Sequence, residues 1–240
     1  MFEEFVSHGV TEDTPKNIML GAGTIHKNFA YGYYSLTTEP NDWNTNYKNY
    51  YTKSGSTYSK VSGSTAPSFS SGTYYDQRWN FVESLIGATS GGSKVTITPE
   101  IKTVEVDGAL VKVKGLDYKV GEVAKLETNL VEITPELLKS TIIGQTATSD
   151  VTGFDMITSK SDISSGDYFE NFAFVGKKGD GMPIIIIFEN ALCTSGFETE
   201  AKNKDNAVVK CVFECYQDTT GDLTKLPYKI YYPTATSNSN

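Results

Sequence analysis

The stretch of sequence that decides the fold is Leu85–Gly115, LIGATSGGSKVTITPEIKTVEVDGALVKVKG. In its first half, Val95 and Ile97 alternate with polar residues, which is the pattern of a strand with one buried face. Pro99 follows directly, and a proline cannot donate a ladder hydrogen bond. The sequence therefore predicts a strand around Val95 that is interrupted at Pro99.

The second half of this stretch predicts a β-hairpin over Glu100–Gly115. Ile101 to Val106 leads into Asp107-Gly108, a dipeptide typical of two-residue hairpin turns, and Leu110 to Lys114 forms the returning strand. Charged residues run along the hairpin and few large apolar residues flank them. Such a hairpin makes a poor core element, so we expect it to extend beyond its domain and to contact another subunit.

Further strands are indicated downstream by alternating or continuous apolar residues. Val120–Ile133 alternates apolar with polar positions, and Phe172–Val175 with Pro183–Phe188 reads as a second hairpin. Ala207–Tyr216 is a two-faced strand and Tyr228–Tyr232 a short final one. Many short strands in mostly antiparallel order predict a mainly β fold, a sandwich or a barrel.

One short flanking helix is predicted after these alternating residues. Thr134 is a suitable N-cap, Pro135 occupies the first helical position, and Glu136 lies in the first turn. Gly144 is expected to end the helix. The following segment, Gln145 to Asp167, is predicted to be a polar bridge that leads to the next strand.

The amino-terminal region is predicted to hold a polar arm, residues 1–13, before a short strand at Ile18 to Leu20. Gly21 and Gly23 follow directly and argue against a helix that extends beyond Leu20, so a short strand is predicted instead. The arm is too polar to fold alone, but it can gain order by lying across a neighbouring subunit. We therefore expect Phe2, Phe5 and Val6 to be buried only in an assembled state.

Residues 30–80 differ from the rest of the chain. Most of the chain's 15 tyrosines and both of its tryptophans fall here, with few Leu, Ile or Val. We expect a long Tyr/Ser/Gly-rich insertion into a β domain made of 14–29 and 81–233, with a disordered tail at 234–240. Its candidate contact residues are Trp43, Tyr47, Tyr50, Tyr51 and Trp79. Tyr and Trp are enriched both at subunit interfaces and where rings stack on sugars.

Composition excludes several function classes. With 29 acidic and 21 basic residues the net charge is −8, which disfavours tight nucleic-acid binding. The longest aliphatic run, Ile184 to Phe188, does not reach the length of a membrane span, and no secretory signal is visible. We expect synthesis in the cytoplasm and no membrane insertion. In a strand, Cys211 and Cys215 lie about 13 Å apart, too far to bridge, so the three cysteines are predicted to be core residues.

Catalytic and metal-binding motifs are weak or missing. Gly87–Lys94 has the glycines of a phosphate-binding loop, but Ser precedes Lys and a strand follows. The two histidines, His8 and His26, have no partner at metal-ligand spacing, and no G-x-S-x-G elbow occurs. We therefore predict no enzyme activity, no cofactor and no metal.

Taken in order, the segments TPKNIMLGAG, GATSGG, PEIKTVEVDG, KGLDYKVGEVAKLETNLVEITPELLK, ENFAFVGK and KIYYP resemble the major tail proteins, or tail tube proteins, of long-tailed bacteriophages and prophages of Gram-positive hosts. The resemblance covers most of residues 11–29 and 82–233, and the insertion departs from it. It implies a β-sandwich or barrel whose subunits form hexameric rings, stacked into a tube through which DNA is ejected. It carries over no catalytic residues.

The same resemblance implies the partners and the place of the protein. The chain would contact itself, a tape measure protein inside the tube, and terminator and baseplate proteins at its ends, with DNA passing transiently; it would be made in the bacterial host cytoplasm and end in the virion tail. The candidate assembly contacts on the hairpin are Ile101, Val104, Val106, Asp107 and Gly108. The alternative is an aromatic-rich β-sandwich that binds carbohydrate.

Overall fold

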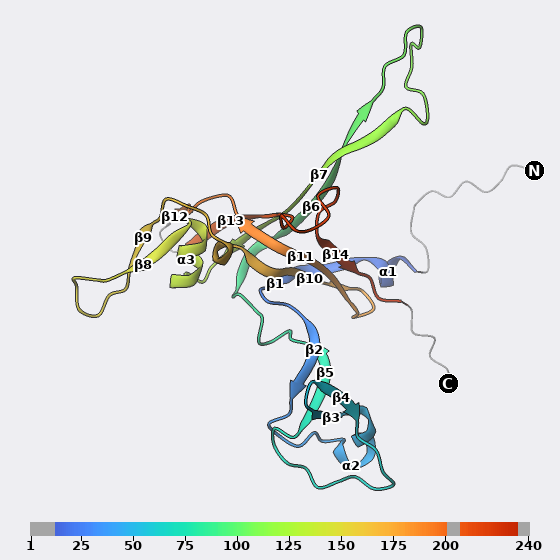
Figure 1. Ribbon diagram of the computed structural model, residues 1–240, viewed down its shortest axis with the longest axis vertical. Helices are drawn as coiled ribbons and strands as arrows, with labels where there is room; N and C mark the ends of the chain where they lie inside the picture. Colours follow the sequence, from blue (N-terminus) through green and yellow to red (C-terminus); the bar gives the residue numbers. More distant parts are fainter. Residues whose placement is uncertain (1–12, 201–206, 235–240) are drawn as a thin grey trace, which may run out of the picture. The chain divides into compact units, whose positions relative to one another are not determined.

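The computed structural model describes residues 13–200 and 207–234. The chain divides into two compact units, which we call unit 1 and unit 2 (Figure 1). Unit 2 is Phe29–Ser84, close to the predicted insertion, and unit 1 takes in the flanking segments Met1–Asn28 and Leu85–Asn240. The predicted contacts Phe2, Phe5 and Val6 lie outside the described residues.

Unit 1 is built on one antiparallel sheet. Its strands are β1 (Met19–His26), β6 (Thr89–Thr103), β7 (Asp117–Leu130), β10 (Phe169–Lys178), β11 (Pro183–Cys193), β12 (Thr199–Glu200), β13 (Val208–Cys215) and β14 (Tyr228–Tyr231). Their order is β1-β10-β11-β13-β7-β6, with β12 beside β13 and β14 beside β11. The predicted mainly β class and the β10–β11 hairpin are confirmed.

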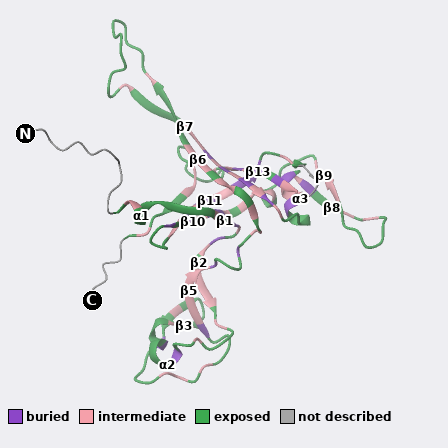
Figure 2. Ribbon diagram, turned by 180° about the vertical axis from the view of Figure 1, so that it is seen from behind, coloured by how far each residue is buried: buried purple, intermediate pink, exposed green. Residues whose placement is uncertain are grey.

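The sheet curls round its core. The backbone N–H of Ile86, just before the edge strand β6, donates to the carbonyl of Ile25 in the opposite edge strand β1 at 3.0 Å. Alternate residues of β13 are buried, and the strand carries the buried colour in Figure 2. Val209 and Phe213 are fully buried. All three cysteines are buried and free, as predicted for core residues.

The predicted helix is confirmed as α3 (Pro135–Thr141). The Thr134 hydroxyl accepts from the backbone N–H of Leu137 at 3.2 Å, which satisfies one of the free donors of the first turn. The polar bridge predicted after it was assigned no strand from the sequence. This segment contains a hairpin of β8 (Gly144–Ala147) and β9 (Met156–Ser159), followed by η2 (Ser165–Asp167). A further short helix, α1 (Thr14–Asn17), precedes β1.

Two predicted strand ends are wrong, because bulges carry the strands onward. β1 continues past Gly21 and Gly23 to His26, with a register shift between Leu20 and Thr24. A Cβ at Gly23 would stand 2.3 Å from the Phe174 ring, so this position needs glycine.

Pro99 does not interrupt β6 either. Pro99 lies opposite Glu122 of β7, and β6 forms an edge of the sheet. The missing N–H of a proline is tolerated on an edge strand, because the outer side of that strand needs no partner. The strand therefore runs on to Thr103.

Unit 2 has a small sheet and a core of its own. It contains β2 (Tyr31–Ser35), α2 (Trp43–Asn46), η1 (Tyr47–Asn49), β3 (Tyr51–Ser54), β4 (Thr57–Lys60) and β5 (Tyr74–Trp79). The sheet order is β2-β5-β3-β4. The buried core consists of Trp43, Tyr47, Val61 and Tyr74.

Candidate assembly surfaces

The β6–β7 hairpin continues beyond the packed part of unit 1 as an arm, residues 100–120 (Figure 1). Its ladder ends at the pair Thr103 and Asp117, whose side chains hydrogen-bond to each other. Residues 104–116, which we call the tip, lie beyond this pair. The predicted hairpin of Ile101–Val106 with Leu110–Lys114 is therefore wrong in its pairing, although the turn at Asp107-Gly108 exists.

Few backbone hydrogen bonds hold the tip. The N–H of Val104 donates to the Leu116 carbonyl at 2.9 Å, and that of Ala109 donates to the Val106 carbonyl at 3.1 Å across the turn. The N–H of Leu116 donates to the Val113 carbonyl at 3.2 Å. The two sides of the tip stand apart around a hollow of about 430 Å³ lined by their own residues.

The tip exposes apolar side chains that a folded domain normally buries. Leu110 is 98% and Val111 77% exposed, and Val104, Val106 and Val113 are also exposed. Of the predicted assembly contacts, Val104, Val106, Asp107 and Gly108 lie on the tip, and Ile101 lies on the arm at 64% exposure. The structure thus brings these five candidates together on one projection (Figure 2). An exposed apolar cluster of this kind is a candidate contact surface.

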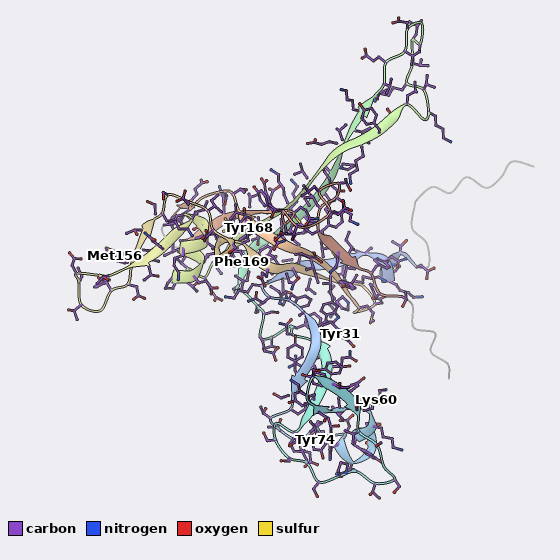
Figure 3. All side chains as sticks on the ribbon, in the orientation of Figure 1. Tyr31, Lys60, Tyr74, Met156, Tyr168 and Phe169 are labelled. Atoms are coloured by element: carbon purple, nitrogen blue, oxygen red, sulfur yellow. The ribbon has the colours of Figure 1, made fainter. Side chains whose placement is uncertain are left out.

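A second projection is the β8–β9 hairpin, which the sequence interpretation missed. Its loop, residues 148–155, exposes Phe154 at 70% and Val151 at 53%, and Met156 follows in β9 (Figure 3). Apolar residues are few and scattered in this stretch, so periodicity gave no strand signal. It is a smaller candidate contact surface than the tip.

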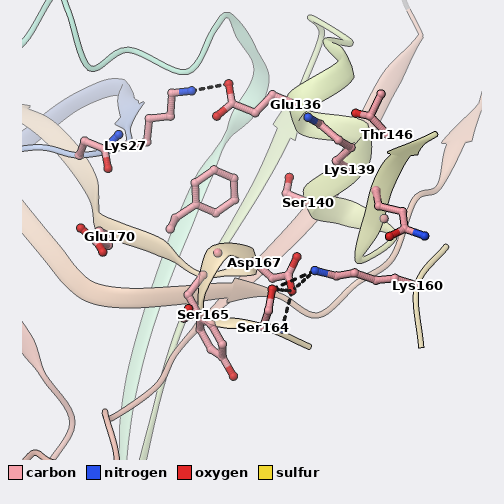
Figure 4. A pocket seen from close by; sticks show the side chains of 16 residues that line it. Lys27, Glu136, Lys139, Ser140, Thr146, Lys160, Ser164, Ser165, Asp167 and Glu170 are labelled. Carbon is pink, nitrogen blue, oxygen red and sulfur yellow. Dashed lines mark hydrogen bonds and ion pairs between the residues drawn. The ribbon is translucent and has the colours of Figure 1, made fainter. Parts of the chain in front are cut away.

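A polar cleft of about 540 Å³ lies between α3, η2 and the end of β1 (Figure 4). Its charged residues are largely paired with one another: Lys27 with Glu136, and Lys160 with Asp167. Burial opposes ionisation of Asp167, but hydrogen bonds from Lys160 and Ser164 outweigh it and hold the pKa of this carboxyl below its usual value. The first pair joins the end of β1 to α3, and the second joins η2 to the residue that follows β9, so four of the cleft's charged residues have a structural role.

The aromatic candidates of unit 2 lie in two environments. Trp43 and Tyr47, which the sequence suggested as contact residues, are core residues instead, because their indole N–H and hydroxyl find backbone carbonyl partners inside the unit. The other three are half-buried: Tyr50 donates to Asp42 at 2.6 Å, Tyr51 to Gln77 at 3.2 Å, and Trp79 stacks on Phe29.

Reactive groups are sparse in the described part of the chain. It contains no group of three or more His, Cys, Asp or Glu residues that could hold a metal ion. A hydrogen bond from the Cys211 thiol lowers the pKa of Cys193 to about 6, but both thiols are buried. Burial lowers the pKa of His26 to about 4, so its ring is neutral near pH 7. Gly91 and Gly92 lie in β6, so a strand continues after them. A phosphate-binding loop needs a helix at that place.

Comparisons with known proteins assign no family: the sequence matches no protein-family model and no curated protein. Among residues 13–200 and 207–234, no helix is both long and apolar enough to cross a membrane. The proposal below is based on the exposed projections of unit 1.

Proposed function

We propose that this chain is a structural subunit of a bacteriophage tail tube, assembling as stacked hexameric rings that form the channel for DNA ejection. The observation that carries the proposal is the exposed apolar tip at the end of a long two-stranded arm, added to the sequence resemblance. A monomeric protein rarely keeps such a cluster in water, whereas a subunit of a polymer buries it against its neighbour.

The architecture of unit 1 supports the same role. Its curled antiparallel sheet ends in edge strands, and edge strands can pair with those of a neighbouring copy. The net charge of −8 suits a channel that must let DNA pass without holding it, since acidic groups repel phosphates. The tape measure, terminator and baseplate proteins are its proposed partners, and the virion tail is its proposed place.

Assembly is tested directly on the purified full chain. Sedimentation and negative-stain microscopy over a range of concentrations should show rings or hollow tubes. A matched variant replaces residues 104–116 by Asn-Gly, a dipeptide that closes a two-residue hairpin, between Thr103 and Asp117. It should keep the β-sheet circular dichroism signal and sediment as a monomer. Tubes of normal length from this variant would refute the role of the tip, and a wild-type chain that stays monomeric at every concentration would refute the proposal itself.

Unit 2 is proposed to decorate or brace the tube rather than line its channel. Its attachment points are close, because Ile25 and His26 pair with Ile86 and Leu85 at its two ends. A short Gly/Ser linker in place of Phe29–Ser84 should therefore leave the fold of unit 1 and the channel diameter unchanged. Loss of the channel in a map of such tubes would show that unit 2 lines it.

The carbohydrate-binding alternative is less well supported. Two of the five aromatic residues suggested for it, Trp43 and Tyr47, are buried in the core of unit 2. Sugar stacking needs a ring face that is open to solvent. Retention of the full chain on a panel of immobilised glycans, without assembly at any concentration, would favour this alternative over the tube.

A further inference from the structure

The tip carries two short segments with the same alternation and opposite charge. Val104-Glu105-Val106-Asp107 precedes the turn, and Val111-Lys112-Val113-Lys114 follows it. In an extended conformation each segment places valines on one face and charged residues on the other. Cross-strand pairs of opposite charge, and of β-branched residues, are the pairs that stabilise antiparallel ladders.

These complementary segments do not pair within one chain, although their sequence suggests a hairpin. Every residue from Val104 to Gly115 is exposed, and the two sides stand apart around the hollow of about 430 Å³. Among the described residues, none forms an ion pair with the four charged side chains Glu105, Asp107, Lys112 and Lys114.

The register explains why pairing fails in the chain itself. At the base of the tip, Thr103 lies opposite Asp117, and continuing this ladder would set Val106 against Lys114 and Asp107 against Val113. A two-residue turn at Asp107-Gly108 would instead set Glu105 against Leu110. Neither register matches charge with charge.

A register that does match charge is out of step with the base of the arm. Setting Glu105 against Lys114 also sets Asp107 against Lys112 and Val106 against Val113. This register differs from that of the base by an odd number of residues, and such a slip turns side chains to the opposite face of a sheet. The geometry of β6 and β7 therefore leaves the matching register unused.

We infer that the tip pairs with the tip of a second copy of this chain, the Val104–Asp107 segment of one copy lying antiparallel to the Val111–Lys114 segment of the next. The register of one chain's base does not constrain a segment from another chain. In this pairing Glu105 and Asp107 face Lys114 and Lys112, and the valines of both segments share one face. The inference rests on the proposed self-assembly and names the contact that drives it.

A tube needs a head-to-tail contact, in which the acidic and the basic segment of one tip pair with two different neighbours. Each tip accepts a neighbour on its acidic side and another on its basic side, so the contact propagates from copy to copy and is not used up in a closed dimer. Main-chain hydrogen bonds supply affinity in such strand addition, and the alternate side chains set the register.

Two charge-reversal variants test the contact. E105K/D107K makes both segments basic and K112E/K114E makes both acidic, so each variant alone should assemble only at a concentration about tenfold or more above wild type, a factor that corresponds to about 1.4 kcal/mol. Mixed in equal amounts, they should co-assemble near the wild-type concentration, because basic and acidic segments then meet between copies. The fourfold variant E105K/D107K/K112E/K114E should assemble alone.

Controls separate the possible failures. K48E/K60E gives the same change of net charge as K112E/K114E at exposed positions of unit 2, and it should assemble like wild type. All variants should keep the wild-type far-ultraviolet circular dichroism spectrum, since the reversed side chains are exposed.

The outcomes distinguish the inference from the proposed function. Restoration by the fourfold variant but not by the mixture would mean that the segments pair within one chain, and would overturn the inference. Single variants that assemble like wild type would overturn it as well while leaving tube assembly standing. A wild-type chain that never assembles would overturn both.

Discussion

The two units reach a buried core with different side chains. Unit 1 buries mostly Phe, Leu, Ile, Val and Cys inside a curled sheet, and Phe213 packs against Phe172 with ring centroids 4.2 Å apart. Unit 2 has almost no aliphatic residues to bury and relies on Trp43, Tyr47 and Tyr74. Both solutions remove large apolar area from water, but in unit 2 most of the core side chains themselves carry a hydrogen-bonding group.

Those polar groups need partners, and the loops of unit 2 supply them. The Trp43 indole N–H donates to the Pro67 carbonyl at 2.8 Å, and the Tyr47 hydroxyl donates to the Gly63 carbonyl at 2.9 Å. The loop containing Gly63 and Pro67 is thus held by the core side chains themselves. A segment rich in Tyr, Ser and Gly can therefore fold when its rings are large and each hydroxyl reaches a carbonyl.

The largest expected effect is the loss of Phe213 from unit 1. Phe213→Ala removes a fully buried ring from the centre of the sheet and should lower the free energy of unfolding of unit 1 by about 3–5 kcal/mol. Far-ultraviolet circular dichroism in urea measures it, because most strands belong to unit 1. Tryptophan fluorescence reports on unit 2 alone, since both tryptophans lie there. A fluorescence transition that moved together with the dichroism would mean that the two cores unfold as one.

The matching experiment in unit 2 is Trp43→Ala. The change should cost about 3–5 kcal/mol, because it empties the core and leaves the Pro67 carbonyl without its donor. The emission of the remaining Trp79 should then show an unfolded unit 2, while the strand signal of unit 1 persists. Retention of a cooperative fluorescence transition near the wild-type midpoint would show that the aromatic core is not what holds unit 2.

Local signals in the sequence predicted local structure well. The Thr134 cap with Pro135 fixed the start of α3, and the apolar residues on both sides of a glycine-rich turn predicted β10 and β11, because these signals act within a few residues. The predicted interruption at Pro99 was wrong because the effect of a proline depends on whether its strand is an edge strand. That property of β6 is set by the complete sheet.

The candidate contacts were also mispredicted where they depend on residues far away in the sequence. The sequence located the exposed tip but predicted the wrong pairing in it, because the register at Thr103 and Asp117 is set by the whole β6–β7 ladder. It suggested Trp43 and Tyr47 as contacts because residue type alone does not tell a ring that packs inside a unit from one that packs outside.

Acidic pH should destabilise unit 1 more than unit 2. Because the pKa of His26 lies at about 4 in the folded state and near 6.5 when unfolded, unfolded unit 1 binds the extra proton between these values. Unit 1 should therefore lose up to about 3 kcal/mol of stability as the pH falls from 6.5 to 4, at 1.36 kcal/mol per pK unit. Unit 2 contains no histidine and should change less.

The acid effect is assigned to this side chain with His26→Gln, measured by urea denaturation at pH 6.5 and pH 4. The glutamine keeps a hydrogen-bonding group near the Thr24 hydroxyl, which lies 2.8 Å from the His26 ring nitrogen. It should flatten the dichroism-detected pH dependence of unit 1. An unchanged slope would mean that carboxyl groups, not this histidine, cause the loss.

The smallest effect tests whether the hydroxyls of unit 2 do more than fill space. Tyr47→Phe keeps the buried ring but removes the donor to the Gly63 carbonyl, so fluorescence-detected urea denaturation should show a loss of about 1–2 kcal/mol. Tyr74→Phe is the matched control, because Tyr74 is also buried but its hydroxyl lies 3.5 Å from the Ser68 carbonyl, at the limit of a hydrogen bond. That change should cost less than about 0.5 kcal/mol, since a weak bond contributes little. A loss of less than about 0.5 kcal/mol at both positions would show that ring packing alone holds unit 2, and the contrast between the two cores would then be one of side-chain size and not of polarity.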